Sequence, residues 1–212
     1  MENYGNTSIT DFVLDLSAKL PTPGGGGAAA LVGALGTALG GMVASYTIGK
    51  VKYDDVDEEM RALKVGAYRV QKELLELIDK DAEVFAPLAG AYKMPNGTEE
   101  EKESKARMIQ AGMKEASLVP LKIIEKCAEA LDYIEIFAKK GNKMMVSDAG
   151  CGAIICKAAM QAAWLNVRVN TKGIKDEMFV KRVESKALSL LENYLARADE
   201  IYYNIESDFA GE

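Results

Sequence analysis

Hydrophobic residues recur at spacings of three and four positions along most of this 212-residue chain, and the two-residue alternation of a β-strand is nearly absent. Such spacing places apolar side chains on one face of an α-helix. Prolines, glycines and polar turn residues divide the pattern, and we expect helices over about 8–19, 28–48, 57–92, 98–139, 147–169 and 176–209. No internal repeat or low-complexity linker separates these segments. The pattern therefore predicts one all-α domain over 1–212, a bundle of about six helices.

Two of the expected helix starts carry a capping signal. Ser8 is followed three residues later by Asp11, and Thr98 is followed by Glu101 at the same spacing. A hydroxyl at the first position accepts a hydrogen bond from the backbone N–H three residues on, and an acid there can accept one in return. We also expect the fourth helix to be interrupted before Pro120, because proline lacks the N–H of the helical hydrogen bond.

The expected second helix consists largely of glycine and alanine. Gly33, Gly36, Gly40 and Gly41 lie inside it, although each glycine costs about 1 kcal/mol relative to alanine. Close approach of neighbouring helices, of a ligand, or of both would explain them, since glycine has no Cβ. The stretch 24–49 has no charged residue and is long enough to span a bilayer. Its scattered large apolar residues instead favour a central helix buried in a soluble, cytoplasmic protein without a membrane partner.

Composition narrows the chemistry that the chain can perform. It is 49% hydrophobic and 27% charged with a net charge of −6 and no run rich in lysine and arginine, so we expect a globular protein that does not bind nucleic acid. Its three cysteines form no C-x-x-C pair, which argues against a disulfide framework or a zinc site. The sequence has no histidine, which excludes Ser-His-Asp and Cys-His catalysis and histidine metal ligands. Chemistry must therefore use carboxylates, lysine, tyrosine, hydroxyls, amides and the backbone.

The first candidate site is the run Pro21-Thr22-Pro23-Gly24-Gly25-Gly26-Gly27 that precedes the second helix. Consecutive glycines at a helix N-terminus expose backbone N–H groups beside the positive end of the helix dipole, which suits an anion or a polarised carbonyl. No Gly-Lys-Ser/Thr follows and no strand precedes, so the run is neither a Walker motif nor a dinucleotide fingerprint. A flexible turn is the alternative interpretation.

Asp81 interrupts an apolar seam in the expected third helix. The seam steps by four and three residues through Leu74, Ile78, Asp81, Phe85, Leu88 and Tyr92. A carboxylate at such a position must find a partner, shift its pKa or face a cavity. A structural salt bridge is the alternative to a functional role.

Other candidates lie at the ends of expected helices. Lys50, Lys52 and Tyr53 follow the second helix, where lysines also complement the helix dipole. Asp148, beside Ser147, is the only acid in 141–170, and its alternative role is to stabilise a helix N-terminus. Amides that could read a heterocycle, or serve in turns and caps, are Asn142, Asn166 and Asn170.

Together these segments resemble one family. The residues that carry the resemblance are Leu20-Pro21-Thr22-Pro23-Gly24-Gly25-Gly26-Gly27-Ala28-Ala29-Ala30, Thr47-Ile48-Gly49-Lys50-x-Lys52-Tyr53, Gly141-Asn142, Ser147-Asp148 and Asn166-Val167-x-Val169-Asn170. They are similar, in this order, to the cyclodeaminase/cyclohydrolase family, which includes the C-terminal domain of formiminotransferase-cyclodeaminase and stand-alone bacterial methenyltetrahydrofolate cyclohydrolases. The resemblance implies an all-helical homodimer that acts on a tetrahydrofolate derivative in one-carbon metabolism without a metal or bound cofactor.

Two activities share this family. A cyclohydrolase adds water to 5,10-methenyltetrahydrofolate and releases 10-formyltetrahydrofolate, whereas a cyclodeaminase closes 5-formiminotetrahydrofolate onto N10 and expels ammonia. The segment from Ser147 to Gly150 and the one from Leu165 to Gly173 look closer to the cyclohydrolases, and no formiminotransferase domain is attached, so we expect a cyclohydrolase. The cyclodeaminase is the alternative, and a non-enzymatic helical interaction protein is the alternative from another class.

The resemblance and the chemistry of the residues together suggest roles. We expect Asp148 to aid attack by water, Asp81 to be a second carboxylate, and Lys50 to donate a proton or stabilise the tetrahedral intermediate. Lys52 could attract the glutamate tail of the folate. The remaining expected substrate contacts are Pro23, Gly24, Gly25, Gly26, Tyr53, Asn142, Ser147 and Asn166. All of these residues are expected to surround one cavity.

Overall fold

A computed structural model describes residues 4–210 as a bundle of α-helices. The α-helices are α1 (Ile9–Ser17), α2 (Gly25–Thr47), α3 (Asp57–Tyr92), α4 (Glu99–Lys140), α5 (Val146–Thr171) and α6 (Glu177–Ala210). Three short 3₁₀-helices are η1 (Tyr4–Asn6), η2 (Val51–Val56) and η3 (Lys143–Met145). No strand occurs in residues 4–210, and the predicted all-α bundle of six helices is confirmed.

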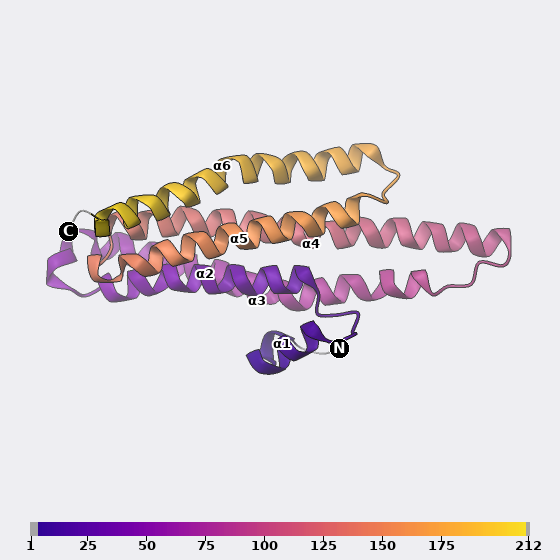
Figure 1. Ribbon diagram of the computed structural model, residues 1–212, viewed down its shortest axis with the longest axis horizontal. Coiled ribbons are helices and arrows are strands. Elements are labelled where there is room, and N and C mark those ends of the chain that lie inside the picture. Colours follow the sequence, from indigo (N-terminus) through magenta and orange to yellow (C-terminus); the bar gives the residue numbers. More distant parts are fainter. Residues whose placement is uncertain (1–3, 211–212) are drawn as a thin grey trace.

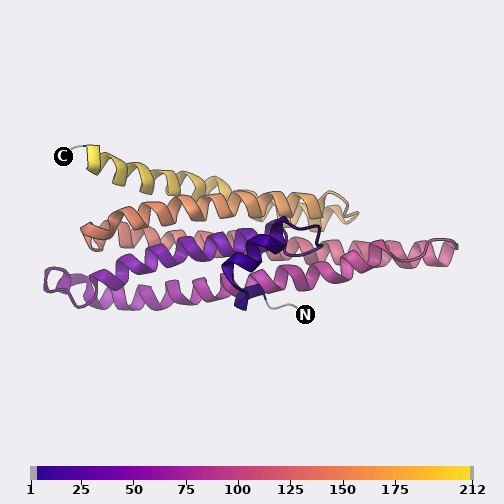
Figure 2. The same cartoon turned by 60° about the horizontal axis from the view of Figure 1, so that its bottom comes forward.

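The long helices lie side by side along one axis of an elongated molecule (Figures 1 and 2). α2, α3, α4 and α5 form the body of the bundle, and α6 packs on α5 and α4. The short helix α1 stands outside this body, and η1 anchors the segment before it to α3. α2 packs against α3, α4 and α5, so the glycine- and alanine-rich helix is central as predicted.

The glycines of α2 allow it to approach α5 closely. A Cβ built on Gly36 would lie 2.6 Å from Cys156 Sγ and 2.9 Å from the carbonyl oxygen of Gly152, and a Cβ on Gly152 would lie 2.7 Å from the carbonyl oxygen of Gly36. Each glycine therefore makes room for the backbone of the other helix. α2 is the one described helix that is long and apolar enough to cross a membrane, and 56% of its most apolar stretch is buried within the bundle.

Two predicted helix boundaries need correction. α2 begins at Gly25 rather than at 28, because the glycines themselves form its first turn. α4 continues through Pro120, which is buried between Val119 and Leu121, so the expected interruption does not occur. Proline removes one backbone hydrogen bond, and packing of the buried neighbours holds the helix together around it. The predicted caps are confirmed: Ser8 accepts from the N–H of Asp11, and Thr98 with Glu101 forms a capping box.

Candidate functional site

A cavity of about 170 Å³ lies beside the glycine turn, where four helices meet. The turn and the first residues of α2 form one wall, and two residues of α3, one of α4 and three of α5 form the others. The lining residues are Pro21, Thr22, Gly24, Gly25, Gly26, Asp81, Phe85, Ala116, Asn166, Val169 and Asn170. We call this cavity the glycine-turn cavity.

Asp81 brings a carboxylate into the glycine-turn cavity from α3. Its Oδ2 accepts a hydrogen bond from the backbone N–H of Gly27 at 2.9 Å. Among residues 4–210, no lysine or arginine pairs with this carboxylate, so the alternative of a structural salt bridge is wrong. Burial raises the pKa of Asp81, and the hydrogen bond from Gly27 only partly offsets that effect. The sequence left three outcomes open for this seam position, and Asp81 lines a cavity, has a raised pKa and accepts one backbone hydrogen bond.

The glycines of the turn are needed because polar side chains close over the start of α2. A Cβ on Gly26 would lie only 2.1 Å from Asp81 Oδ1, and a Cβ on Gly25 would lie 3.0 Å from Asn166 Nδ2. The N–H groups of Gly25 and Gly26 belong to the first turn of α2, which has no intrahelical acceptor for them. The run thus leads into the first turn of α2 and forms part of the cavity wall.

Two asparagines on α5 line the same cavity. Asn166 Nδ2 donates to the carbonyl oxygen of Ala162 at 2.9 Å, and Asn170 Nδ2 donates to that of Ala116 at 2.8 Å. Each amide therefore keeps one N–H donor and its oxygen acceptor. Asn170 was among the amides that could read a heterocycle but not among the expected substrate contacts, although it follows Asn166 by one helical turn and so shares its face. Phe85, which the seam pattern places one turn after Asp81, was missed in the same way.

Of the other predicted residues, Pro23 is buried in the turn and does not line the cavity, and the rest form a second group near the end of α2. The Tyr53 hydroxyl donates to Asn142 Oδ1 at 3.4 Å, and Asn142 Nδ2 donates to the carbonyl oxygen of Tyr46 at 2.9 Å. The Lys52 ammonium lies 5.7 Å from the centre of the Tyr53 ring. Lys50 lies beside them, just beyond α2.

Asp148 belongs to this second end of the bundle as well. It lies in the first turn of α5, together with Ser147, and it makes no hydrogen bond or ion pair to the described residues 4–210. α5 follows directly on η3, whose N-cap is Asn142. Lys50, Lys52, Tyr53, Asn142, Ser147 and Asp148 are called the distal group below.

The glycine-turn cavity and the distal group lie at opposite ends of α2 and α5. Asp148 precedes Asn166 by eighteen residues on one helix, a separation of about 27 Å at 1.5 Å per residue. Because α2 and α5 run antiparallel, the start of α2 meets the end of α5, as the contact between Gly25 and Asn166 shows. The expectation that Asp81, Asp148 and Lys50 surround one cavity is therefore wrong for a single copy of the chain.

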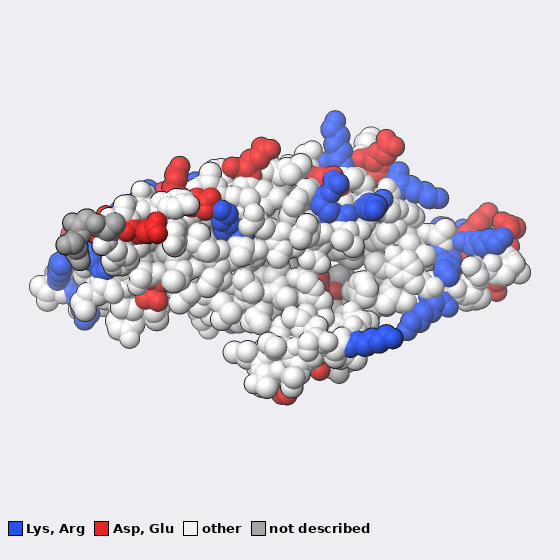
Figure 3. All heavy atoms as spheres, in the orientation of Figure 1, with Lys and Arg blue, Asp and Glu red and all other residues white. Residues whose placement is uncertain are grey.

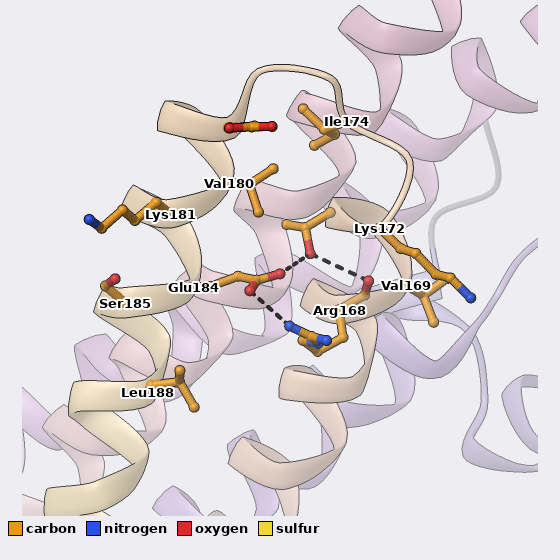
Figure 4. A pocket seen from close by; sticks show the side chains of 11 residues that line it. Arg168, Val169, Lys172, Ile174, Val180, Lys181, Glu184, Ser185 and Leu188 are labelled. Carbon is orange, nitrogen blue, oxygen red and sulfur yellow. Dashed lines mark hydrogen bonds and ion pairs between the residues drawn. The ribbon is translucent and has the colours of Figure 1, made fainter.

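A larger cavity of about 750 Å³ lies between the end of α5 and the start of α6 (Figure 4). Both carboxylate oxygens of Glu184 have a hydrogen-bond partner there: Oε2 accepts from Arg168 at 2.8 Å, and Oε1 accepts from the Thr171 hydroxyl at 2.5 Å. Lys172 and Lys181 extend away from this centre on opposite sides. None of the predicted site residues lines this cavity, although Val169 is shared with the glycine-turn cavity.

Comparison with known proteins identifies the family of the chain. The family model for formiminotransferase-cyclodeaminase matches residues 8–189. The chain belongs to this family. It is 39% identical over 203 residues to the methenyltetrahydrofolate cyclohydrolase of Methylorubrum extorquens, with 96% of this chain and 98% of that protein covered.

Other relatives of the family carry the second activity in their names. The chain is 32% identical over 202 residues to the formimidoyltransferase-cyclodeaminase of Rattus norvegicus, and it spans 37% of that protein. It also resembles the crystal structure of formiminotetrahydrofolate cyclodeaminase from Thermotoga maritima, with a TM-score of 0.80, 32% identity and 97% coverage of both chains. The recognition made from the motifs is thus confirmed.

Proposed function

We propose that this protein is a methenyltetrahydrofolate cyclohydrolase, which hydrolyses 5,10-methenyltetrahydrofolate to 10-formyltetrahydrofolate. The observation that carries the proposal is the match with the Methylorubrum extorquens cyclohydrolase over nearly the whole of both chains. Formiminotetrahydrofolate cyclodeaminase is the second candidate, because the structural relative from Thermotoga maritima also matches over 97% of both chains. Both activities would make this chain an enzyme, which the family membership supports against a non-enzymatic interaction protein.

The reaction needs few groups from the protein, because the substrate is already electrophilic. Water attacks the bridging carbon of the methenyl cation and loses a proton, which gives a tetrahedral carbon that bears a hydroxyl, N5 and N10. The bond to N5 then breaks as the hydroxyl loses its proton and becomes the formyl carbonyl. N5 takes up a proton, and the formyl group remains on N10. A carboxylate near the bridge can accept the proton from water, and an ammonium can supply one to N5. The distal group holds both kinds, in Asp148 and Lys50.

The glycine-turn cavity alone is too small for this substrate. Its volume of about 170 Å³ lies below the roughly 300–1,000 Å³ usual for ligand sites. It also lacks the ammonium group, since no lysine or arginine lines it. We therefore propose that it binds the pterin ring and that the distal group of a second copy completes the site.

A twofold axis through the middle of the α2–α5 face would bring the two halves together. Such an axis reverses the direction of both helices, so the start of α2 in one copy faces the end of α2 in the other. In the resulting homodimer, each glycine-turn cavity would receive Lys50 and Asp148 from the other copy. Two equivalent sites would form, one at each end of the interface.

The surface of α2 and α5 supports this pairing. The view in Figure 3 shows a broad area without charged side chains over the middle of one face. Large apolar side chains stand exposed on both helices, with 49% of Leu35 and 51% of Tyr46 accessible on α2 and 66% of Leu165 accessible on α5. Exposed apolar side chains on an uncharged surface of this kind are typical of an interface.

The activity is tested with two substrates offered separately to the purified protein. We expect loss of the methenyl absorbance of 5,10-methenyltetrahydrofolate at a rate above buffer hydrolysis, with no ammonia released from 5-formiminotetrahydrofolate. Appearance of methenyl absorbance together with ammonia would instead identify the cyclodeaminase. No change with either substrate would refute both enzymatic assignments.

The shared site is tested by mixing two inactive variants. Asp81→Ala inactivates the glycine-turn half and Asp148→Ala inactivates the distal half, so each homodimer should be inactive. After subunit exchange, half of the dimers would be mixed and each would carry one intact site, which restores about a quarter of the wild-type activity. If both halves acted within one chain, every site would keep one lesion and no activity would return.

A further inference from the structure

The two oxygens of the Asp81 carboxylate have different surroundings. Oδ2 is held by the backbone N–H of Gly27 at 2.9 Å, whereas Oδ1 has no hydrogen-bond partner among residues 4–210. Within the same described residues, no fully buried side-chain nitrogen or oxygen lacks a partner. The free Oδ1 is therefore accessible, and Asp81 lines the glycine-turn cavity. One oxygen is fixed to the protein and the other is offered to a ligand.

Asn166 and Asn170 also line the cavity wall. Each amide donates one of its two N–H groups to a backbone carbonyl, so an amide oxygen and one N–H remain on each side chain. Donors also come from the backbone, at the first turn of α2, where the N–H groups of Gly25 and Gly26 have no intrahelical acceptor. A ligand that matches this wall has N–H donors next to a carbonyl oxygen.

We propose that Asp81 is a specificity-determining residue that reads the 2-amino group of the pterin ring. The ring of a tetrahydrofolate carries an amino group at C2, an N–H at N3 and a carbonyl at C4 along one edge. In this arrangement Asp81 Oδ1 accepts from the 2-amino group, and the N–H groups at the start of α2 face the C4 carbonyl. The assignment rests on the proposed folate substrate, and it makes Asp81 a residue that positions the ring rather than the base that activates water.

The hydrogen bond from Gly27 makes this assignment testable by a change of one atom. In Asp81→Asn, the amide oxygen must take the place of Oδ2, because the Gly27 N–H needs an acceptor. The amide NH₂ then occupies the place of Oδ1 and presents a donor to the ligand. A ring with a carbonyl at C2, as in a 2,4-dioxopteridine, would match this variant, whereas a 2-amino ring would place two donors face to face.

The test compares the binding of 6-methylpterin and 6-methyllumazine, which differ in having an amino group or a carbonyl at C2. We expect wild-type protein to prefer 6-methylpterin by at least about tenfold in Kd, since polar discrimination at a base edge is typically of this size or larger. We expect Asp81→Asn to prefer 6-methyllumazine. Glu83→Gln makes the same acid-to-amide change at an exposed position of α3 and should keep the wild-type preference.

Two results would overturn the assignment. Equal affinity of wild-type protein for the two probes would show that C2 is not read, a result that does not depend on any variant. An Asp81→Asn protein that loses affinity for both probes by the same factor would show that the carboxylate acts in some other way. Turnover of 5,10-methenyltetrahydrofolate is measured on the same wild-type sample, so that an active enzyme without the preference refutes the role of Asp81 alone. An inactive protein that binds neither probe refutes the proposed function and this inference with it.

Discussion

Gly26→Ala adds one methyl group at the point where α2 meets the carboxylate of α3. The new Cβ would lie 2.1 Å from Asp81 Oδ1 and 2.7 Å from Asp81 Oδ2, whereas ordinary contacts begin near 3.4 Å. The carboxylate must therefore move by more than an ångström, which breaks its hydrogen bond with the Gly27 N–H and shifts the oxygen offered to the ligand. A hydrogen bond to a charged group contributes about 1.5–3 kcal/mol, so kcat/KM should fall by roughly 10- to 150-fold.

The assay measures kcat/KM for 5,10-methenyltetrahydrofolate together with the thermal midpoint. Gly90→Ala is the control, since a Cβ at that position of α3 meets nothing within 4 Å, and it should leave kcat/KM at the wild-type value. The same Gly26→Ala change is then made in an Asp81→Ala background, where its cost should largely disappear because the carboxylate that it displaces is gone. Full additivity of the two changes, or wild-type activity of Gly26→Ala alone, would refute the proposed role of this contact.

Three further expectations follow from the same contacts. Gly36→Ala should destabilise the fold by about 2 kcal/mol, because its Cβ would meet the α5 backbone at Gly152, and the thermal midpoint should fall by roughly 4–8 °C. Asp81→Asn should raise the thermal midpoint at pH 7, and by less at pH 4. Burial raises the pKa of Asp81, so the free-energy cost of burying its charged form is present above that pKa and is lost as the pH falls through it. Lys50→Met and Asp148→Asn should each lower kcat at least about tenfold. Their melting curves should stay nearly unchanged, since the side chains of Lys50 and Asp148 are accessible and unpaired in one copy of the chain. Wild-type rates in both variants would contradict the proposed chemistry.

The sequence predicts the helices well because their signals are local. The seam of α3 and the capping box that starts α4 are each contained in a few neighbouring residues. The capping box appears in the structure, and Leu74, Ile78 and Leu88 of the seam are buried, whereas Tyr92 at its end is 53% exposed. The anomaly of Asp81 is local too, since a carboxylate in an apolar seam stands out before its surroundings are known. Its contact with Gly27 and its lack of a cation partner depend on how α3 meets α2, which no single segment encodes.

The grouping of the site residues could not be predicted from motif order. The segments containing Gly25, Lys50, Asp148 and Asn166 all resemble parts of one family's motifs, which suggests a single cavity. Because α2 and α5 run antiparallel, Gly25 instead lies beside Asn166, and Lys50 and Asp148 lie at the other end of the two helices. Helix direction, rather than residue type or spacing, decides which of them can act together within one copy.

The composition of α2 supports the proposal that a second copy completes the site. A bundle helix that only packs on its own chain usually carries charged residues on its outer face. α2 carries none along its whole length, and its outer face exposes Leu35 and Tyr46 instead. Its inner face carries Gly33 and Gly36 at the positions where α4 and α5 approach it closely. Packing within the chain explains the glycines on the inner face of α2 but not the absence of charged residues on its outer face. Burial of that outer face against an uncharged helix of a second copy would explain the absence.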